Sequence, residues 1–98
     1  MVKEAKASEM MKKLLFETIL KCETMEELED LFDDLCTFKE VEQMAQRIEA
    51  AKMLTQGKTY AEIIEKTDIS SATLSRVSRC VQRGSGGYAK LLKNNKKI

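Results

Sequence analysis

Three arginines recur at helical spacing in the segment from residue 71 to residue 83, SATLSRVSRCVQR, which contains no carboxylate. At 100° per residue they point within about 50° of one direction, together with two small residues. The five residues on this side are Ala72, Ser75, Arg76, Arg79 and Arg83. Arginine binds phosphates and guanine edges, and small side chains allow a helix to approach bases closely. The pattern predicts the recognition helix of a protein that reads the major groove of duplex DNA.

The opposite side of the same segment carries Leu74, Val77 and Val81, which we expect to anchor it on a core. Of the outward residues, we expect the small ones to meet base edges and the charged ones to contact guanine or the phosphate backbone. The predicted set also includes Ser70, as a cap residue of this helix, and Lys58, which lies upstream. The predicted DNA-binding residues are Lys58, Ser70, Ser71, Ala72, Thr73, Ser75, Arg76, Arg79 and Arg83.

A second helix must precede this one, and residues 57–83 together predict a helix-turn-helix. Thr59 and Glu62 have the spacing of a capping box, which opens a helix, and Gly57 is a natural end for the helix before it. The sequence Asp68-Ile69-Ser70 predicts the turn, with Ile69 filling the angle between the helices. Either Ser70 or the next serine caps the second helix.

Charge is divided unevenly along the 98 residues, although the net charge is only +1. Residues 1–57 hold 8 Lys/Arg against 13 Asp/Glu, a net −5, and residues 58–98 hold 9 against 3, a net +6. A polyanion would attract the second part and repel the first. Such asymmetry also occurs in proteins that bind no nucleic acid.

Composition excludes several classes of function. The chain has no His, and its three cysteines (Cys22, Cys36 and Cys80) show no C-x-x-C spacing, so we expect no metal site and no cofactor. No combination of acid, base and nucleophile indicates an enzyme. No apolar run has membrane length, and we expect a cytoplasmic protein with reduced thiols. A redox role stays open for Cys80, which lies near Arg76 and Arg79 in sequence.

The first half of the chain predicts three helices, and the whole chain an all-α domain. Residues 1–7 are polar and expected to fray; the first helix then runs from near Ser8 to about Cys22. Thr24 with Glu27, and Thr37 with Glu40, have capping-box spacing, opening helices that reach about residues 35 and 56. Because the first helix is apolar around more than half its circumference, residues 8–56 predict a core that dimerises.

The second predicted helix and the C-terminal segment give weaker indications of function. The outer side of the second predicted helix is acidic, a pattern typical of a solvated face and compatible with docking of a basic partner. After the recognition segment, residues 84–98 predict a glycine-rich joint, a short helix marked by Tyr88, Leu91 and Leu92, and a basic tail over 93–97. We expect the tail to be a disordered end, with phosphate contact as the alternative.

The order of these elements resembles the Trp repressor superfamily, and specifically its YerC/YecD-type branch. The likeness covers roughly residues 10–93 and is strongest in LCTFKEVEQMAQRIEAAKMLTQGKTYAEI and SSATLSRV. It implies a six-helix chain in an intertwined homodimer, in which the first three helices of each subunit interlock with the partner. Two-fold symmetry would place the recognition helices about 34 Å apart and predict a palindromic site. Two residues depart from the usual motif, Ile64 where many have a small residue and Asp68 where many have glycine.

The resemblance also implies where a small-molecule effector would bind. In the Trp repressor, tryptophan lies between the central and recognition helices, and the matching positions here are Thr37, Arg47, Arg76, Val77 and Cys80. Val77 stands where the repressor has glycine beneath the indole, and Cys80 where it has a hydroxyl. We therefore predict that Val77 closes the pocket and that tryptophan does not bind, while any other effector stays open. Glu62 replaces an arginine that faces DNA, so the operator cannot be inferred.

The function that these patterns favour is a homodimeric, sequence-specific regulator of transcription that binds double-stranded DNA and acts by steric repression or, as a second choice, by activation. The alternative is a dimeric helical adaptor that kept the fold and binds a protein. The acidic second helix and the missing glycine in the turn support the adaptor. A DNA-binding protein would lose affinity steeply with salt, and an adaptor would bind no duplex.

Overall fold

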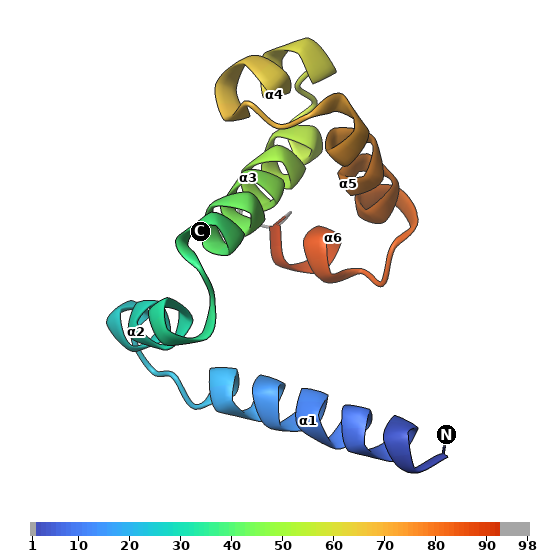
Figure 1. Ribbon diagram of the computed structural model, residues 1–98. Coiled ribbons are helices and arrows are strands. Elements are labelled where there is room, and N and C mark those ends of the chain that lie inside the picture. The colour runs from blue at the N-terminus through green and yellow to red at the C-terminus, as the bar shows by residue number, and fades with distance from the viewer. Residues whose placement is uncertain (1, 93–98) are drawn as a thin grey trace. The chain divides into compact units, whose positions relative to one another are not determined.

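The computed structural model describes residues 2–92, with side chains from residue 6 onward, and this part of the chain contains six helices and no strand. The helices are α1 (Val2–Leu20), α2 (Met25–Leu35), α3 (Phe38–Thr55), α4 (Tyr60–Thr67), α5 (Ser71–Arg83) and α6 (Gly87–Leu92) (Figure 1). The predicted all-α class is confirmed. Of the helices described, none is both long and apolar enough to cross a membrane. The basic stretch 93–97 lies outside the described residues.

The chain is divided into two compact units, and the boundary follows the first residue of α3. One unit runs up to Phe38 and contains α1 and α2; the other begins at Lys39 and contains the rest of α3 with α4, α5 and α6. The prediction that residues 8–56 form a dimerisation core therefore spans both units. It stays a prediction.

Helix α1 is longer at its start than the sequence predicted. It begins at Val2, where the expectation was a frayed segment up to Ser8, and it ends at Leu20. The early residues are mostly Ala, Lys and Glu, which favour helix and include no Gly or Pro to interrupt it. The end is closed by tight turns in which the backbone N–H groups of Lys21 and Cys22 donate to Thr18 and Ile19, each over 3.1 Å.

The predicted capping box of α2 forms only in part. Thr24 caps the helix, and its Oγ1 accepts from the backbone N–H of Glu27 over 3.0 Å. The Glu27 carboxylate accepts from the N–H of Glu23 over 2.8 Å, where a full box would have used the N–H of Thr24. The carboxylate thus satisfies a donor one residue before the cap.

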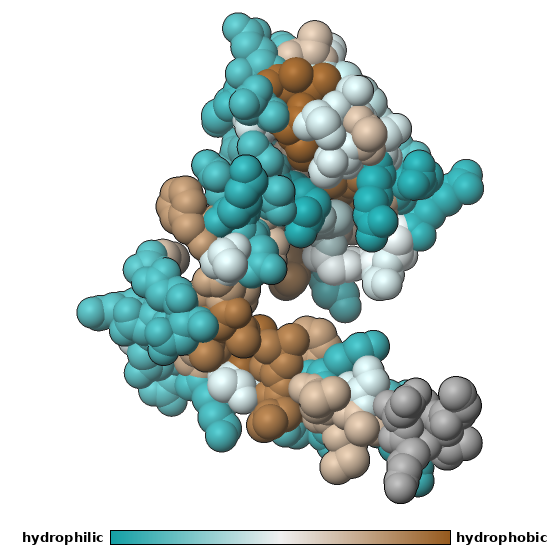
Figure 2. Space-filling view, in the orientation of Figure 1, coloured by the Kyte–Doolittle hydropathy of each residue, from teal (hydrophilic) through white to brown (hydrophobic). Residues whose placement is uncertain are grey.

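The first unit exposes much of its apolar surface. None of the described side chains between residues 6 and 38 is buried. The large apolar side chains that are more than half exposed in this range are Met10, Met11, Leu14, Phe16, Leu20, Met25, Leu35 and Phe38. In Figure 2, brown apolar side chains gather over α1 where the chain meets α2, and the outer side of α2 is teal. A surface of this kind marks an interaction site.

The second unit contains the core. Its buried apolar residues are Ala50, Ala51, Met53, Ile63, Ile69, Leu74 and Val77, supplied by α3, α4, the turn and α5. Ile63, Leu74 and Val77 are almost completely buried, and each contributes about 1.5–3 kcal/mol relative to an exposed side chain. Tyr88 and Leu92 of α6 are half-buried against this cluster.

The junction from α3 to α4 is a single tight turn. Gly57 has φ +82°, a left-handed conformation in which other residues are strained. Its N–H donates to Leu54 and that of Lys58 to Met53, both over 3.1 Å, which is the Schellman pattern of a helix end. Gly57 therefore ends α3 as predicted and sends the chain directly into the next helix.

Candidate nucleic-acid interface

Helix α4 begins with the full capping box that the sequence predicted. Thr59 Oγ1 accepts from the N–H of Glu62 over 3.2 Å, and Glu62 Oε1 accepts from the N–H of Thr59 over 2.8 Å. The hydrogen bond from the Thr59 backbone lowers the pKa of Glu62, with smaller contributions from the Thr59 hydroxyl and the charge of Lys58. The ionised Glu62 carboxylate is therefore part of the helix start.

The turn between α4 and α5 takes the left-handed conformation at Asp68, with φ 64° and ψ 21°. Among residues other than glycine in the described chain, only this one has a positive φ. Asp tolerates this conformation better than most side chains do, so the glycine of the usual motif is not needed here. Ile69 follows with 3% exposure, and it fills the angle between the helices as predicted.

Ser70 caps α5, which settles the choice that the sequence left open. Its Oγ accepts from the N–H of Thr73 over 3.1 Å and donates to Thr73 Oγ1 over 2.9 Å. Thr73 is half-buried. Both hydroxyls are therefore used within the cap, and Ser71, Ala72 and Ser75 are left as the exposed small residues of the predicted base-reading set.

The two faces of α5 divide as the sequence predicted. Leu74 and Val77 are 0% and 1% exposed, and Val81 is half-buried against the core. Ser78 is also buried, at 8% exposure, and the sequence pattern did not indicate it; its Oγ accepts from Gln82 over 3.5 Å. Serine is small enough to fit the inward side of the helix, but as a polar residue it did not stand out in the apolar pattern.

Arg76, Arg79 and Arg83 are exposed. Ion pairs join Lys13 to Glu17 and Lys66 to Glu49, and among the residues that the structure describes no carboxylate is paired with any of the three arginines. Lys58 is also exposed. The contacts of these residues with DNA stay predictions.

The end of α5 carries a hollow of about 450 Å³ lined by Arg79, Cys80, Gln82, Arg83 and Gly84. Two guanidinium groups border it, and no carboxylate does. Anionic groups such as the phosphates of a DNA backbone fit this charge.

Four of the five predicted effector positions come together in one hollow. Arg47, Arg76, Val77 and Cys80 line a space of about 430 Å³, together with Thr73 and Tyr88. Val77 packs on the core with 1% exposure and lines this space, and its predicted closure of a tryptophan pocket stays a prediction. Thr37 precedes α3 and belongs to the other compact unit, and its place at the pocket stays a prediction.

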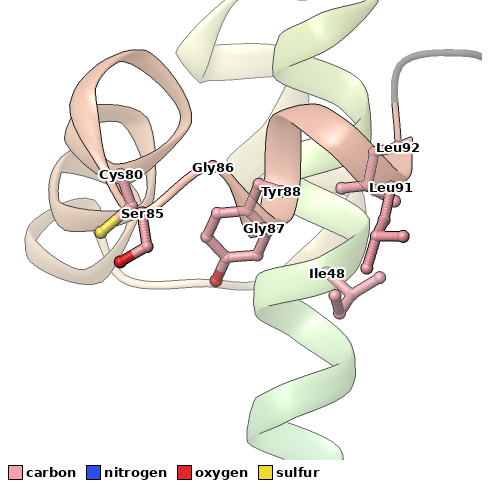
Figure 3. Close-up of a pocket in the computed structure, with 8 residues that line it drawn as sticks. All are labelled: Ile48, Cys80, Ser85, Gly86, Gly87, Tyr88, Leu91 and Leu92. Carbon is pink, nitrogen blue, oxygen red and sulfur yellow. The ribbon is translucent and has the colours of Figure 1, made fainter.

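A third hollow, of about 400 Å³, is more apolar and lies between α3, α5 and α6. Figure 3 shows Leu91 and Leu92 of α6 beside Ile48 of α3, with the Tyr88 ring facing the side where Cys80 and Ser85 lie. Ile48 and Leu91 are 49% and 81% exposed. The sequence marked Tyr88, Leu91 and Leu92 as a short helix and did not indicate that they border a hollow.

Cys80 borders all three hollows, and its thiol is free and half-exposed. Cys22 and Cys36 are free as well. Among the described residues, no three Cys, Asp or Glu side chains are placed to hold a metal ion.

A hydrogen bond and an ion pair join α3 to α4, and the sequence pattern predicted neither of them. Gln46 Nε2 donates to the carbonyl of Thr67 over 3.1 Å, and Lys66 Nζ lies 3.1 Å from Glu49 Oε2. The partners are 21 and 17 residues apart, and no local motif encodes such pairs. They hold the end of α4 on α3.

The fold and this site define a helical protein with a helix-turn-helix whose second helix presents an acid-free cationic face. The family model described as "Trp repressor protein" matches residues 10–96, and the chain belongs to that family. Family membership indicates a DNA-binding regulator, a class that is generally not enzymatic.

Relatives of this chain fit the same family. It is similar to the uncharacterized protein YerC of Bacillus subtilis (strain 168), with 47% identity over 74 residues, or 76% of this chain and 71% of that protein. A crystal structure of a candidate Trp repressor from Staphylococcus aureus matches with a TM-score of 0.81 and 43% identity, covering 86% of this chain and 84% of the other. A TrpR-like protein from Eubacterium eligens ATCC 27750 matches with a TM-score of 0.82 and 40% identity, covering 88% and 89%.

Proposed function

We propose that this protein is a homodimeric transcriptional regulator that binds a palindromic DNA site through α5 and acts by steric repression. The observation that carries the proposal is the outward face of α5, where Arg76, Arg79 and Arg83 are exposed and form no ion pair with a carboxylate of the described residues. An exposed cationic face of this kind suits a polyanionic duplex, and a helix-turn-helix presents it to the major groove.

Each exposed residue has a role that its chemistry supports. Ser71, Ala72 and Ser75 meet base edges near the start of α5, and the Ala72 methyl offers an apolar contact to thymine. Arg76 and Arg79 contact guanine or phosphate, and Lys58 and Arg83 contact the backbone. Ser70 and Thr73 take part through the cap, which orients the first turn of the helix.

Dimerisation is supported by the apolar surface of the first unit. Helix α1 exposes 81% of Leu20, 62% of Leu14 and 59% of Phe16, an arrangement that a partner subunit would stabilise by covering. Two copies related by two-fold symmetry would present two recognition helices to half-sites about one turn of DNA apart. We therefore expect the preferred site to be a palindrome.

We propose further that tryptophan is not the corepressor. Arg47 and Arg76 border the hollow of about 430 Å³ and are able to sandwich an aromatic ring, but Val77 and Cys80 replace the glycine and hydroxyl expected of a tryptophan site. Calorimetric titration of the protein with L-tryptophan tests this. We expect no heat of binding at micromolar ligand, and micromolar affinity would contradict the proposal.

The decisive experiment is a selection of bound duplexes from random DNA with the full-length chain, followed by inspection of the enriched sequences. We expect a site with two-fold symmetry, bound with an affinity that falls steeply as salt rises. Enrichment of an asymmetric site would remove the dimeric arrangement. Failure to enrich any sequence, with no salt-dependent binding to any duplex, would remove DNA recognition itself.

The adaptor is the second candidate, and one observation favours it. The outer side of α2 carries Glu26, Glu27, Glu29, Asp30, Asp33 and Asp34, all exposed. The other argument for it fails, because Asp68 holds the turn in the left-handed conformation without glycine. An adaptor would capture a basic protein through α2 and leave every duplex in the selection unbound.

A further inference from the structure

The side chain of Gln46 reaches from the middle of α3 to the last carbonyl of α4. An α-helix leaves its last four carbonyls without partners inside the helix. Here the Thr67 carbonyl accepts from Gln46 Nε2 over 3.1 Å, from a residue 21 positions upstream. The bond is partly buried and ties the beginning of the turn to α3.

Thr67 extends this connection into the turn itself. Its Oγ1 donates to the carbonyl of Ile63 over 2.8 Å and accepts from the N–H of Ile69 over 3.2 Å. Ile63 and Ile69 are 0% and 3% exposed, so the hydroxyl lies between two core residues. One side chain thus joins the last turn of α4 to the residue that fills the angle between α4 and α5.

The neighbouring ion pair between Lys66 and Glu49 joins the same two helices. Its side chains are 64% and 37% exposed, and a solvent-exposed pair contributes only about 0–1 kcal/mol. The partly buried bonds of Gln46 and Thr67 constrain direction more closely, because a hydrogen bond weakens steeply once its angle falls below about 120°. The Gln46 bond is therefore the stronger determinant of how the end of α4 lies on α3, and the Thr67 hydroxyl fixes the turn that follows.

We propose that Gln46 and Thr67 are positioning residues that set the angle of α5 relative to α3 and so determine sequence-specific DNA recognition. The proposal rests on the proposed function. Ser70 follows Ile69 directly and caps α5, so a rotation at Thr67 moves the first turn of α5, where base edges would be read. Phosphate attraction depends on charge and tolerates a change of angle. Loss of these bonds should therefore reduce specific binding selectively.

Matched variants isolate the two bonds. Gln46→Met keeps the length of the side chain and removes the donor; Thr67→Val keeps the shape and removes the hydroxyl; Thr67→Ser keeps the hydroxyl. Gln43→Met, at an exposed position of α3, is the control for Gln46. Thr55→Val is the control for Thr67, since Thr55 Oγ1 donates to Lys52 within the end of α3 over 2.7 Å and joins no second helix.

The first measurement compares affinity for the selected duplex with affinity for a duplex of random sequence. We expect Gln46→Met and Thr67→Val to weaken specific binding by roughly three- to tenfold, the range that one net hydrogen bond provides. Random-sequence binding should stay within about twofold, since the phosphate contacts are intact. Thr67→Ser should restore specificity, and both controls should match the parent chain. A parallel fall of both affinities that tracks the unfolded fraction would overturn the proposal.

The second measurement needs no DNA. Residual dipolar couplings on the free protein report the angle between α3 and α5, which should change in Gln46→Met and Thr67→Val and return in Thr67→Ser. An unchanged angle in either folded variant would overturn the proposal. If the parent chain binds no duplex, the proposed function fails, and an altered angle would still establish Gln46 and Thr67 as the residues that orient α5.

Discussion

The two compact units of this protein differ in how far their amphipathic helices bury their apolar side chains. The unit from Lys39 onward buries its apolar residues internally, with Ile63 and Leu74 at 0% exposure. The unit up to Phe38 has no buried side chain among those described, and it exposes most of its large apolar residues. The first unit thus presents an apolar surface and the second a cationic one.

This contrast indicates that the two units have different roles. A small core, caps and hydrogen bonds join α4 and α5 to α3, whereas α1 and α2 leave much of their apolar surface exposed. Charge follows the same division, since residues 1–38 hold 5 Lys/Arg against 10 Asp/Glu, a net −5, and residues 39–98 hold 12 against 6, a net +6. We therefore expect DNA contact to depend on the second unit and association between copies on the first.

The largest effect should come from the core of the second unit. Ile63→Ala should lower the free energy of unfolding by about 2–5 kcal/mol, because it leaves a cavity at a fully buried position. Urea denaturation followed by helical circular dichroism measures it. A loss below about 1 kcal/mol would show that the second unit does not depend on this core.

A change in the first unit should act through association. Leu14→Ser on α1 removes an exposed apolar side chain, which costs an isolated chain little and a dimer about 1–3 kcal/mol if the partner covers it. Sedimentation over a range of concentrations should show a weaker dimer. Lys12→Ser, an exposed polar position on the same helix, is the control. A dimer of unchanged strength would place the interface elsewhere.

Removal of one arginine from α5 should affect DNA binding without affecting association between copies. Arg79→Ala should weaken binding to DNA and reduce the slope of log affinity against log salt by about one, with the dimer intact. Fluorescence anisotropy at several salt concentrations gives the slope. Lys21→Ala, which removes a cation from the first unit, should leave it unchanged. If the slope is the same in Arg79→Ala, that residue lies outside the DNA contact.

The smallest effect should be the pH dependence of the cap of α4. Because the Thr59 backbone holds the pKa of Glu62 below its ordinary value of 4.5, the folded state favours the carboxylate. Its stabilisation is complete above 4.5 and is lost as pH falls through the lowered value of the folded state.

Glu62→Gln accepts the same hydrogen bond at every pH. Unfolding followed between about pH 6 and pH 3 should therefore show the parent chain losing stability relative to this variant. Glu65→Gln removes the same charge from α4 away from the cap and controls for net charge. A parent chain and Glu62→Gln variant that lose stability in parallel would contradict the role assigned to the cap.

Local sequence determined where most helices begin and end. Thr24, Thr59 and Gly57 act within one turn of the chain, so their capping and terminating roles are readable without knowledge of the fold. The same is true of the two faces of α5, whose periodicity follows from helical geometry. The start of α1 was missed because good helix formers continue upstream of Ser8 without a capping signal to mark a boundary.

Only the tertiary structure decided how these helices are held and what space they enclose. The bond from Gln46 to Thr67 and the hollow beside Val77 depend on residues far apart in sequence. The hollow beside Val77 is bordered by residues of α3, α5 and α6, and no local pattern relates these residues to one another. Residue types and periodicity thus determined which surfaces exist, because those depend on neighbours three or four positions away. Packing determined their geometry, because it joins groups that no local pattern relates.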